Sequence, residues 1–381
     1  MSKKERRSVP VLRFKGFTDD WEQRKWKDIL LVNSGKDYKH LSRGSIPVYG
    51  TGGYMLSVNK ELSNVDAIGI GRKGTIDHPQ YLKAPFWTVD TLFFMTPKND
   101  INIDFAFGIS RTVNWKKYDE STGLPSLSKK SIDNISIKLP NYDEQIKIGQ
   151  MISQIDKVIS LQQRKLEYYR KLKKRLSNKV FSTENYGATV TLGKIFNTVT
   201  DYVANGSFKS LRENVKTYSN KNYAYLIRLQ DASNNWQGPW LYTDKKGYDF
   251  LKKSKLRPGD IIMANVGSVG KVFQVPDLSY PMTLAPNAIL LRSKAANNAF
   301  LFEFLRSDYG QNLVRKVTTP GVQNKINKTD FKKITIRLPK KEIQDKWASL
   351  FESLNQIELG QLSSISNLKE IKKFLLQNMF I

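Results

Sequence analysis

The 381-residue chain has no cysteine and only two histidines, His40 and His78. This composition excludes disulfides, thiolate chemistry and Cys/His zinc sites. We expect the cytoplasm as its location, because an absence of cysteine is compatible with a reducing compartment. Long apolar runs are absent too: none approaches the roughly 20 residues of a membrane-spanning helix. The basic N-terminus leads into no hydrophobic segment of the kind that a signal peptide requires.

Negative charge is scarce. The sequence has 35 acidic against 62 basic residues, which gives a formal net charge of +27 and a pI near 9.9. This excess is far beyond what solubility requires and indicates a polyanionic partner. Nucleic acid is the first candidate and an anionic membrane surface the second. A hydrophobic content of 40% is sufficient for two globular domains with cores of their own.

An internal repeat organises the chain. The segment LSKKSIDNISIKLPNYDEQ (127–145) matches INKTDFKKITIRLPKKEIQ (326–344) at an offset of 199 residues, as Leu127 against Ile326 shows. In both copies an alternating Ile-x-Ile-x-Leu ends at proline, which predicts a strand with one buried face.

After each repeated strand the hydrophobic period changes from two to about 3.6 residues, which predicts two long amphipathic helices of about 37 to 41 residues. The first runs from Tyr142 to about Ser182. A long helix with a narrow apolar stripe needs a partner stripe, so we expect the two helices to pack antiparallel. Two unrelated core helices are the alternative, which the shared register disfavours. The predicted contact face, called the seam below, contains Ile148, Ile155, Gln162, Leu166, Leu354, Gln361 and Ile365.

Gln162 and Gln361 are equivalent in the repeat and lie near the middle of the predicted helices. In an antiparallel pair of repeats the midpoints face each other, which predicts a polar Gln162–Gln361 layer that fixes the register. The alternative, that both amides point into solvent, is equally compatible with the sequence.

Two glycine-rich turns follow short apolar runs: AIGIGRKGTIDHP (67–79) and IIMANVGSVGKVF (261–273). Neither fits a nucleotide cradle, because no helix start follows the first and the second lacks the glycine and hydroxyl spacing of a P-loop. We match Gly71 and Gly74 to Gly267 and Gly270 by their place in the repeat. Each turn is either a plain β-turn or a contact for DNA phosphate. The candidate DNA-binding residues here are Arg72, Lys73, Thr75, Ser268 and Lys271.

Polar and aromatic side chains gather in two further segments, RLQDASNNWQGPW (228–240) and TTPGVQNKINKTDF (318–331). Asparagine and glutamine can pair with adenine, whereas arginine and lysine suit guanine and phosphates. The second set of DNA-binding candidates is Asn234, Asn235, Trp236, Gln323, Asn324 and Lys325. Solvated turns of a lysine-rich protein are the alternative for each residue.

Catalytic motifs are missing. No methyltransferase Asn/Asp-Pro-Pro-aromatic motif, His-Glu-x-x-His motif or Ser-His-Asp set is found. A nuclease pattern of two acids and a lysine, Asp277 with Asp330 and Lys332, is disfavoured because its parts lie more than fifty residues apart. We therefore expect no catalytic residue and no metal site.

The order of these features along the chain, and their duplication, make the chain resemble the specificity subunits of Type I restriction-modification enzymes. The resemblance spans nearly the whole chain and depends on VPVLRFKGFTDDWEQRKWKDI (9–29), YGTGGYM (49–55), GRKGTI, FWTVDTLFF, GSVGKV and LAPNAILLR, together with the two Leu-Pro junctions before the helices. It implies two α/β target-recognition domains, 15–140 and 187–340, and two spacer helices, 141–186 and 341–381. Each domain would read one half of a split DNA target, and the antiparallel helices would set the gap between the halves.

The resemblance also implies partners that carry out the chemistry. Two modification subunits would methylate adenine with S-adenosylmethionine, and restriction subunits would hydrolyse ATP with Mg²⁺ and cut DNA. This chain would then bind double-stranded DNA and no cofactor. The alternatives are a stand-alone nuclease or methyltransferase, or a basic coiled-coil scaffold. A circular arrangement of the repeats is implied as well, so that the N-terminal stretch packs on the C-terminal end of the second helix.

Overall fold

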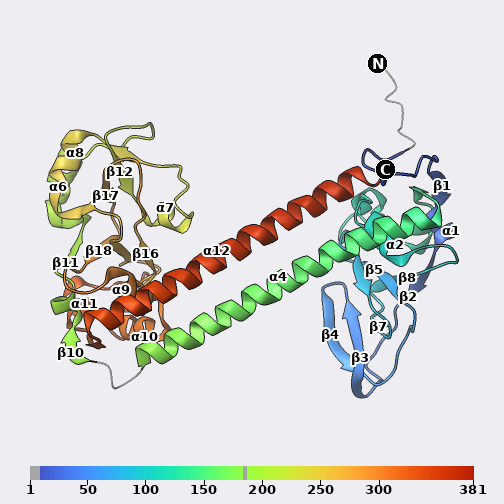
Figure 1. Ribbon diagram of the computed structural model, residues 1–381, viewed down its shortest axis with the longest axis horizontal. Helices are drawn as coiled ribbons and strands as arrows, with labels where there is room; N and C mark the ends of the chain where they lie inside the picture. Colours follow the sequence, from blue (N-terminus) through green and yellow to red (C-terminus); the bar gives the residue numbers. More distant parts are fainter. Residues whose placement is uncertain (1–8, 183–186) are drawn as a thin grey trace. The chain divides into compact units, whose positions relative to one another are not determined.

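The computed structural model describes residues 9–182 and 187–381 (Figure 1). The chain forms two compact units, Met1–Lys165 with Gln361–Ile381, and Leu166–Gly360. Each unit therefore contains one globular domain and a part of each long helix.

The domain of the first unit contains three sheets. An antiparallel four-stranded sheet has the order β2 (Leu30–Ser34), β8 (Leu92–Pro97), β5 (Ala67–Gly71), β6 (Gln80–Leu82). A mixed sheet has the order β4 (Gly53–Val58), β3 (Arg43–Gly50), β7 (Trp87–Thr88), and β1 (Glu22–Lys25) pairs with β9 (Ser136–Leu139). The helices are α1 (Trp26–Ile29), α2 (Ile103–Ser110), the 3₁₀ helix Trp115–Tyr118 and α3 (Lys129–Asp133).

The domain of the second unit repeats this plan. An antiparallel sheet has the order β11 (Thr198–Asp201), β18 (Ala288–Arg292), β15 (Ile261–Ala264), β16 (Val272–Gln274). A mixed sheet has the order β13 (Tyr242–Thr243), β12 (Ala224–Ile227), β17 (Met282–Leu284), β14 (Lys255–Leu256), and β10 (Ala188–Thr191) pairs with β19 (Thr335–Leu338).

The helices of this domain are α5 (Leu192–Ile195), α6 (Phe208–Asn214), α7 (Leu229–Ser233), α8 (Lys245–Phe250), α9 (Asn298–Arg306), α10 (Asp308–Lys316) and α11 (Lys328–Lys333), with 3₁₀ helices at Tyr202–Asn205 and Lys252–Ser254. The two domains therefore share an α/β plan, as predicted.

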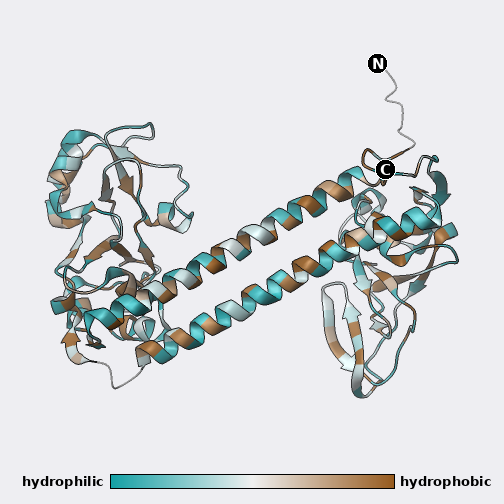
Figure 2. Ribbon diagram, in the orientation of Figure 1, coloured by the Kyte–Doolittle hydropathy of each residue, from teal (hydrophilic) through white to brown (hydrophobic). Residues whose placement is uncertain are grey.

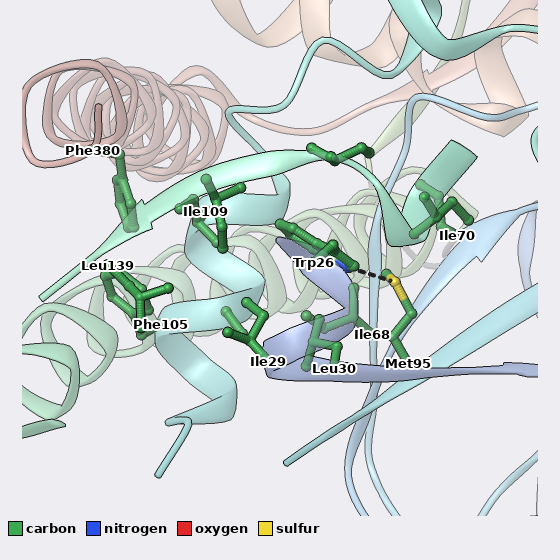
Figure 3. Close-up of a cluster of buried hydrophobic side chains, with 14 of the residues drawn as sticks. Trp26, Ile29, Leu30, Ile68, Ile70, Met95, Phe105, Ile109, Leu139 and Phe380 are labelled. Atoms are coloured by element: carbon green, nitrogen blue, oxygen red, sulfur yellow. Dashed lines mark hydrogen bonds between the residues drawn. The ribbon is translucent and has the colours of Figure 1, made fainter. Parts of the chain in front are cut away.

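The main core of the first domain lies between its antiparallel sheet and the helices (Figure 3). Every residue of β5 is buried, which explains its uninterrupted apolar sequence AIGIG. Trp26 is completely buried, and its indole Nε1–H donates to the Met95 sulfur at 3.0 Å. Ile148 and Ile152 of the first long helix and Met379 and Phe380 at the C-terminus join the same core, so the helix ends are parts of the domain.

The two long helices are α4 (Tyr142–Ser182) and α12 (Lys341–Asn378). Hydrophilic and hydrophobic residues alternate along both (Figure 2), as an amphipathic period requires. In the first unit Asp156 of α4 contacts Lys372 of α12 at 2.5 Å, and in the second unit Arg170 contacts Glu358 at 2.7 Å. Because a later residue of α4 meets an earlier residue of α12, the helices are antiparallel, as predicted.

The predicted seam residues differ in burial. Ile148, Leu166 and Ile365 are buried, whereas Ile155 and Leu354 are partly buried against the domain cores.

The polar layer of Gln162 and Gln361 stays a prediction, and no hydrogen bond joins the two amides. Both amide oxygens are buried, and neither accepts a hydrogen bond. The alternative, amides pointing into solvent, is wrong for the two oxygens.

The circular arrangement of the repeats is confirmed. The backbone N–H of Leu12 donates to the Asn378 carbonyl at 2.9 Å, so the N-terminal stretch contacts the end of α12. Phe380 packs on Phe105 with ring centroids 5.4 Å apart. In the second unit Phe181, at the end of α4, packs in the same way on Phe300 at 5.2 Å. Residues 183–186 of the predicted first spacer lie outside the described residues.

Candidate nucleic-acid interface

The first glycine turn, residues 71–75, joins β5 to β6 and is held by a second loop. The Gly74 N–H donates to the Pro125 carbonyl at 2.8 Å, and the Leu127 N–H donates to the Arg72 carbonyl at 2.9 Å. These two hydrogen bonds occupy backbone groups of the turn and do not involve its side chains. Arg72, Lys73 and Thr75, all predicted to bind DNA, are exposed.

The second glycine turn, residues 264–271, joins β15 to β16 in the same way. The Gly267 N–H donates to the Asn324 carbonyl at 3.0 Å, and the Ile326 N–H donates to the Asn265 carbonyl at 3.1 Å. Ser268 and Lys271 of this turn are exposed. Gln323, Asn324 and Lys325 form the loop that pairs with the turn and are exposed too.

These hydrogen bonds correct the predicted correspondence of the glycines. Gly74 is equivalent to Gly267, and Gly71 is equivalent to Ala264, whereas the sequence comparison matched Gly71 with Gly267 and Gly74 with Gly270. Both turns contain a Gly-x-x-Gly spacing, which suggested the wrong register. The partner residues Pro125 and Asn324 are 199 residues apart, just upstream of the repeated segments, and they fix the register of the turns three residues earlier.

Neither turn is a nucleotide cradle. The first leads into β6 and the second into β16, so no helix N-terminus follows either turn. Gly74 and Gly267 have φ of 83° and 74°, a left-handed conformation that glycine adopts readily. The glycines therefore shape a tight turn that projects its neighbours outward.

The second domain brings all its predicted DNA-binding segments together. Lys271 Nζ donates to Ser233 Oγ at 3.4 Å, which places the second glycine turn beside the end of α7. Asn234 and Asn235 follow there and are exposed. Asn234 is partly occupied, because its amide nitrogen donates to the Gly238 carbonyl at 2.5 Å. Trp236 is half-buried against a hydrophobic cluster, so part of its indole supports the loop.

Two of these residues adopt uncommon backbone conformations. Asn235 has φ of 52° and Trp236 has φ of 59°, a left-handed region that residues other than glycine seldom occupy. Such conformations persist where the surrounding structure imposes them and gather at ligand-binding loops. The shape of this loop is therefore strongly determined.

The charges of the two turns are unbalanced. Within residues 9–182 and 187–381, Arg72, Lys73, Lys271 and Lys325 form no ion pair. Arg72 lies over the Phe93 ring at 5.7 Å and Lys271 over that of Phe273 at 5.1 Å, which orients both cations without neutralising them. Cations without an acidic partner are available for phosphate oxygens.

The sequence analysis missed the loop that supports the first glycine turn, residues 119–126. Asp119 shapes this loop by accepting hydrogen bonds from the backbone N–H groups of Ser126 at 2.9 Å and Ser121 at 3.0 Å, and these hydrogen bonds lower the pKa of the Asp119 carboxyl. Leu124 stands 66% exposed at its tip. Extending the offset of 199 residues upstream aligns Leu124 with Gln323, a predicted DNA-binding residue. This alignment could have identified residues 119–126 as the equivalent loop of the first domain.

No cluster of three or more histidine, aspartate or glutamate side chains suited to a metal ion occurs within the described part of the chain. Asp330 is used locally: its backbone N–H donates to Asn327 at the start of α11, and its carboxylate contacts Lys333 at 3.2 Å. Among the helices of residues 9–182 and 187–381, none is both long enough and apolar enough to span a membrane.

Two α/β domains of the same plan, each followed by a long helix and each presenting a basic glycine turn, define a duplicated recognition protein. The chain belongs to the Type I restriction modification DNA specificity domain family, which matches residues 18–168 and 189–370. It is a specificity subunit of a Type I restriction-modification system with two recognition domains.

Two curated relatives are similar in sequence. The Type I restriction enzyme MjaVIII specificity subunit of Methanocaldococcus jannaschii is 25% identical over 331 residues, 82% of this chain and 72% of the relative. The EcoprrI specificity subunit of Escherichia coli is 23% identical over 111 residues, 29% of this chain and 28% of the relative.

Solved structures share the fold. The S subunit of a Type I restriction-modification system from M. genitalium matches with a TM-score of 0.67 at 16% identity, over 98% of this chain and 99% of that one. A chain from a study of complex assembly and conformational transition of the Type I system matches with a TM-score of 0.53 at 14% identity, over 93% and 96%.

Proposed function

We propose that each domain reads one half of a bipartite DNA target through its glycine turn and the loop paired with it. The observation that carries this proposal is the recurrence, in both domains, of one backbone arrangement that holds different side chains. Arg72 and Lys73 occupy the first turn, where Asn265 and Val266 occupy the second. An identical frame with different side chains suits two readers of different half-sites, because direct readout depends on side-chain identity.

The chain supplies recognition in this proposal, and partner subunits supply catalysis. Modification subunits would use S-adenosylmethionine, restriction subunits would use ATP and Mg²⁺, and this chain would bind no cofactor. The complex would act on DNA in the cytoplasm. A stand-alone nuclease or methyltransferase is not favoured, because residues 9–182 and 187–381 contain no acidic cluster suited to a metal ion and the sequence has no methyltransferase motif.

The long helices would set the gap between half-sites and dock the modification subunits. In the first unit Val158, Leu161, Ile371 and Phe374 are exposed although they lie on helices that already pair. Exposed large apolar side chains on a paired helix suit contacts with a further helix from a partner.

Methylation mapping tests the reading role. The chain is co-expressed with an adenine methyltransferase subunit of a Type I system, and methylated adenines are located by single-molecule sequencing. We expect a motif of two short sequences and a fixed gap. Asn324→Ala should relax only the second half, and the pair Arg72→Ala and Lys73→Ala should affect only the first. Lys60→Ala, an exposed lysine of the first domain away from its turn, is the control and should leave the motif unchanged.

Some results of this mapping would contradict the proposal. One continuous motif, or the same change in both halves from either variant, would overturn the assignment of one half-site to each domain. Absence of methylation from an assembled complex would reject the reading role.

The spacer role has its own test. Adding seven residues to each helix at equivalent positions keeps the seam in register and lengthens the pair by about 10 Å, at 1.5 Å per residue. At about 3.4 Å per base pair, the gap in the methylated motif should grow by about three base pairs. An unchanged gap would show that the helices do not set it.

A further inference from the structure

Each unit contains a pocket where the domain meets the long helices. The first pocket has a volume of about 670 Å³ and is lined by residues that include Arg111, Asp156, Lys369, Lys372, Lys373 and Phe380. The second has a volume of about 280 Å³ and is lined by residues that include Arg170, Lys173, Lys174, Glu303, Arg306 and Glu358.

The two pockets are equivalent in the repeat. The offset of 199 residues places Lys369, Lys372 and Lys373 of α12 on Arg170, Lys173 and Lys174 of α4. In the domains, Asn102 caps α2 and Asn297 caps α9 with the same side-chain bond. Counting nine residues from each cap places Arg111 on Arg306. Each pocket therefore receives three cations from a helix end and one arginine from a domain.

The second pocket neutralises its cations with its own acids. Arg170 contacts Glu358 at 2.7 Å, and Lys174 contacts Asp308 at 3.1 Å. Glu303 accepts from Arg306 at 3.2 Å and from Asn355 at 3.0 Å, and Asn355 in turn bonds Lys173. These contacts fill the space with paired side chains.

Among the described residues that line the first pocket, one acidic side chain accompanies four cations. Asp156 contacts Arg111 at 2.7 Å and Lys372 at 2.5 Å. Lys369 and Lys373 are exposed and form no ion pair within residues 9–182 and 187–381.

The three acids of the second pocket have no counterparts in the first. The positions of Glu358, Asp308 and Glu303 are taken by Ile159, Val113 and Gly108. The Gly108 position also has no room for a side chain, because a Cβ there would lie 2.7 Å from the Phe380 ring. The first pocket therefore keeps a larger volume and the unpaired charge of Lys369 and Lys373.

We propose that the first pocket binds an acidic peptide segment of a partner protein, whose carboxylates replace the acids that the second pocket supplies itself. Ile159, Leu376 and Phe380 add apolar surface between the cations, which suits a peptide that alternates acidic with apolar side chains. A DNA backbone would use the lysines but has no apolar group for this surface. The proposal is separate from DNA reading, since none of its residues belongs to a glycine turn or its paired loop.

A direct binding measurement on the full chain tests the proposal. The probe is a fluorescent nine-residue peptide that alternates glutamate with leucine and phenylalanine, and its comparison is the same peptide with glutamine for glutamate. Fluorescence anisotropy gives both affinities at physiological salt. We expect the acidic peptide to bind at least about tenfold more tightly. The double variant K369E/K373E should reduce its affinity by about tenfold or more.

Two further variants make the result specific to the pocket. Ile159→Glu transplants the second pocket's Glu358 and should pair with Lys369, so it should weaken the acidic peptide without removing a cation. K340E/K346E makes the same change in net charge at exposed lysines of the second unit and should leave the affinity unchanged. Circular dichroism and thermal unfolding verify that each variant is folded.

Several outcomes would overturn the proposal. These are absence of peptide binding, equal binding of the glutamine peptide, and equal losses from K369E/K373E and K340E/K346E. A fourth is loss of duplex-DNA binding in K369E/K373E with unchanged peptide binding, which would assign the lysines to the DNA backbone. A failure of bipartite methylation alone would leave these affinities unaffected, so the two proposals fail separately.

Discussion

Gln145 accepts a hydrogen bond from the backbone N–H of Asn102 at 3.1 Å and thereby joins α4 to the residue that caps α2. The second unit repeats the joint, where Gln344 accepts from the Asn297 N–H at 2.9 Å. Each glutamine also donates to the carbonyl of the proline before its helix, Pro140 or Pro339. One amide therefore satisfies two backbone groups at each domain–helix junction.

Loss of this amide should destabilise the second unit. Gln344 is 3% exposed, so Gln344→Ala leaves the partly buried Asn297 N–H and the buried Pro339 carbonyl without this partner. We expect a loss of about 2–4 kcal/mol in the free energy of unfolding. Chemical denaturation, monitored by hydrogen exchange of α9, measures this loss. Gln356→Ala, an exposed glutamine of the same helix, should change stability by less than about 0.5 kcal/mol. Equal effects would contradict this account.

A buried ion pair fastens the N-terminal stretch. The Glu144 side chain is 0% exposed and accepts from Arg13 Nε and a terminal nitrogen of its guanidinium at 2.7 and 2.8 Å, and these bonds raise the pKa of Arg13. Arg13→Met leaves a buried carboxylate unpaired, which should cost about 3–5 kcal/mol. The double variant R13M/E144I should regain most of this loss, since isoleucine occupies the equivalent position 343. Thermal unfolding measures both, and a double variant no more stable than the single one would contradict the prediction.

The sequence patterns were sufficient to predict the repeat and both long helices, because these features depend on local patterns that recur at one offset, such as the Leu-Pro junctions before Tyr142 and Lys341. The contact of the N-terminal stretch with the end of α12 was implied by the family resemblance. The register of the glycine turns was mispredicted, because it is set by bonds to Pro125 and Asn324, far away in the sequence.

The pairing of charges at the domain–helix junctions was also beyond the sequence. The carboxylate that pairs with the arginine of the domain is Asp156 of α4 in the first unit and Glu303 of α9 in the second. A sequence alignment compares each position only with its equivalent. It therefore does not show that a carboxylate on one element has replaced a carboxylate on another. Only the folded chain shows that Arg111 and Arg306 serve equivalent sites.

The half-buried glutamines Gln162 and Gln361 of the long helices should be replaceable by leucine with a gain in stability. The amide oxygens of Gln162 and Gln361 are buried without hydrogen-bond partners. An apolar side chain of similar size removes that desolvation penalty, so Q162L and Q361L should each stabilise the chain by about 1–2 kcal/mol. Thermal unfolding measures the gain. The neighbouring Gln163 is exposed, and Q163L should give none. A loss of stability in Q162L or Q361L would mean that the amide groups make a necessary contact.

The carboxylate of Asp66 should make stability depend on pH. Burial acts to raise its pKa, but donors from Lys83 at 2.8 Å, the Ala84 N–H at 2.8 Å and the Tyr81 hydroxyl at 2.9 Å outweigh burial and hold the pKa below 3.8. With a lowered folded-state pKa, the contribution is present above pH 3.8 and is lost as the pH falls below it.

Asp66→Asn should accordingly cost about 1–2 kcal/mol near pH 7, and the difference from the unmodified chain should shrink as the pH falls below 3.8. Unfolding midpoints between pH 7 and 3 measure this. Asp90→Asn, at an exposed aspartate of the same domain, should have no such effect. A constant difference across this range would exclude titration of Asp66 as the cause.

Two glycines of the first turn should respond differently to alanine. A Cβ at Gly71 would lie 2.2 Å from the Thr75 carbonyl oxygen, so the backbone must move. A Cβ at Gly74 meets nothing within 4 Å, but its φ of 83° is unfavourable for alanine. We expect Gly74→Ala to cost about 1 kcal/mol and Gly71→Ala about 2–4 kcal/mol.

The same pair tests whether turn geometry matters for recognition. Gly71→Ala should displace Arg72 and Lys73 and weaken DNA binding at fixed salt, whereas Gly74→Asn should retain it because asparagine tolerates positive φ. Thermal unfolding and duplex-DNA affinity of the full chain measure the two effects side by side. If Gly71→Ala kept full affinity in a folded protein, the turn would not hold these cations against the DNA, and the reading site of the first domain would have to lie on another loop.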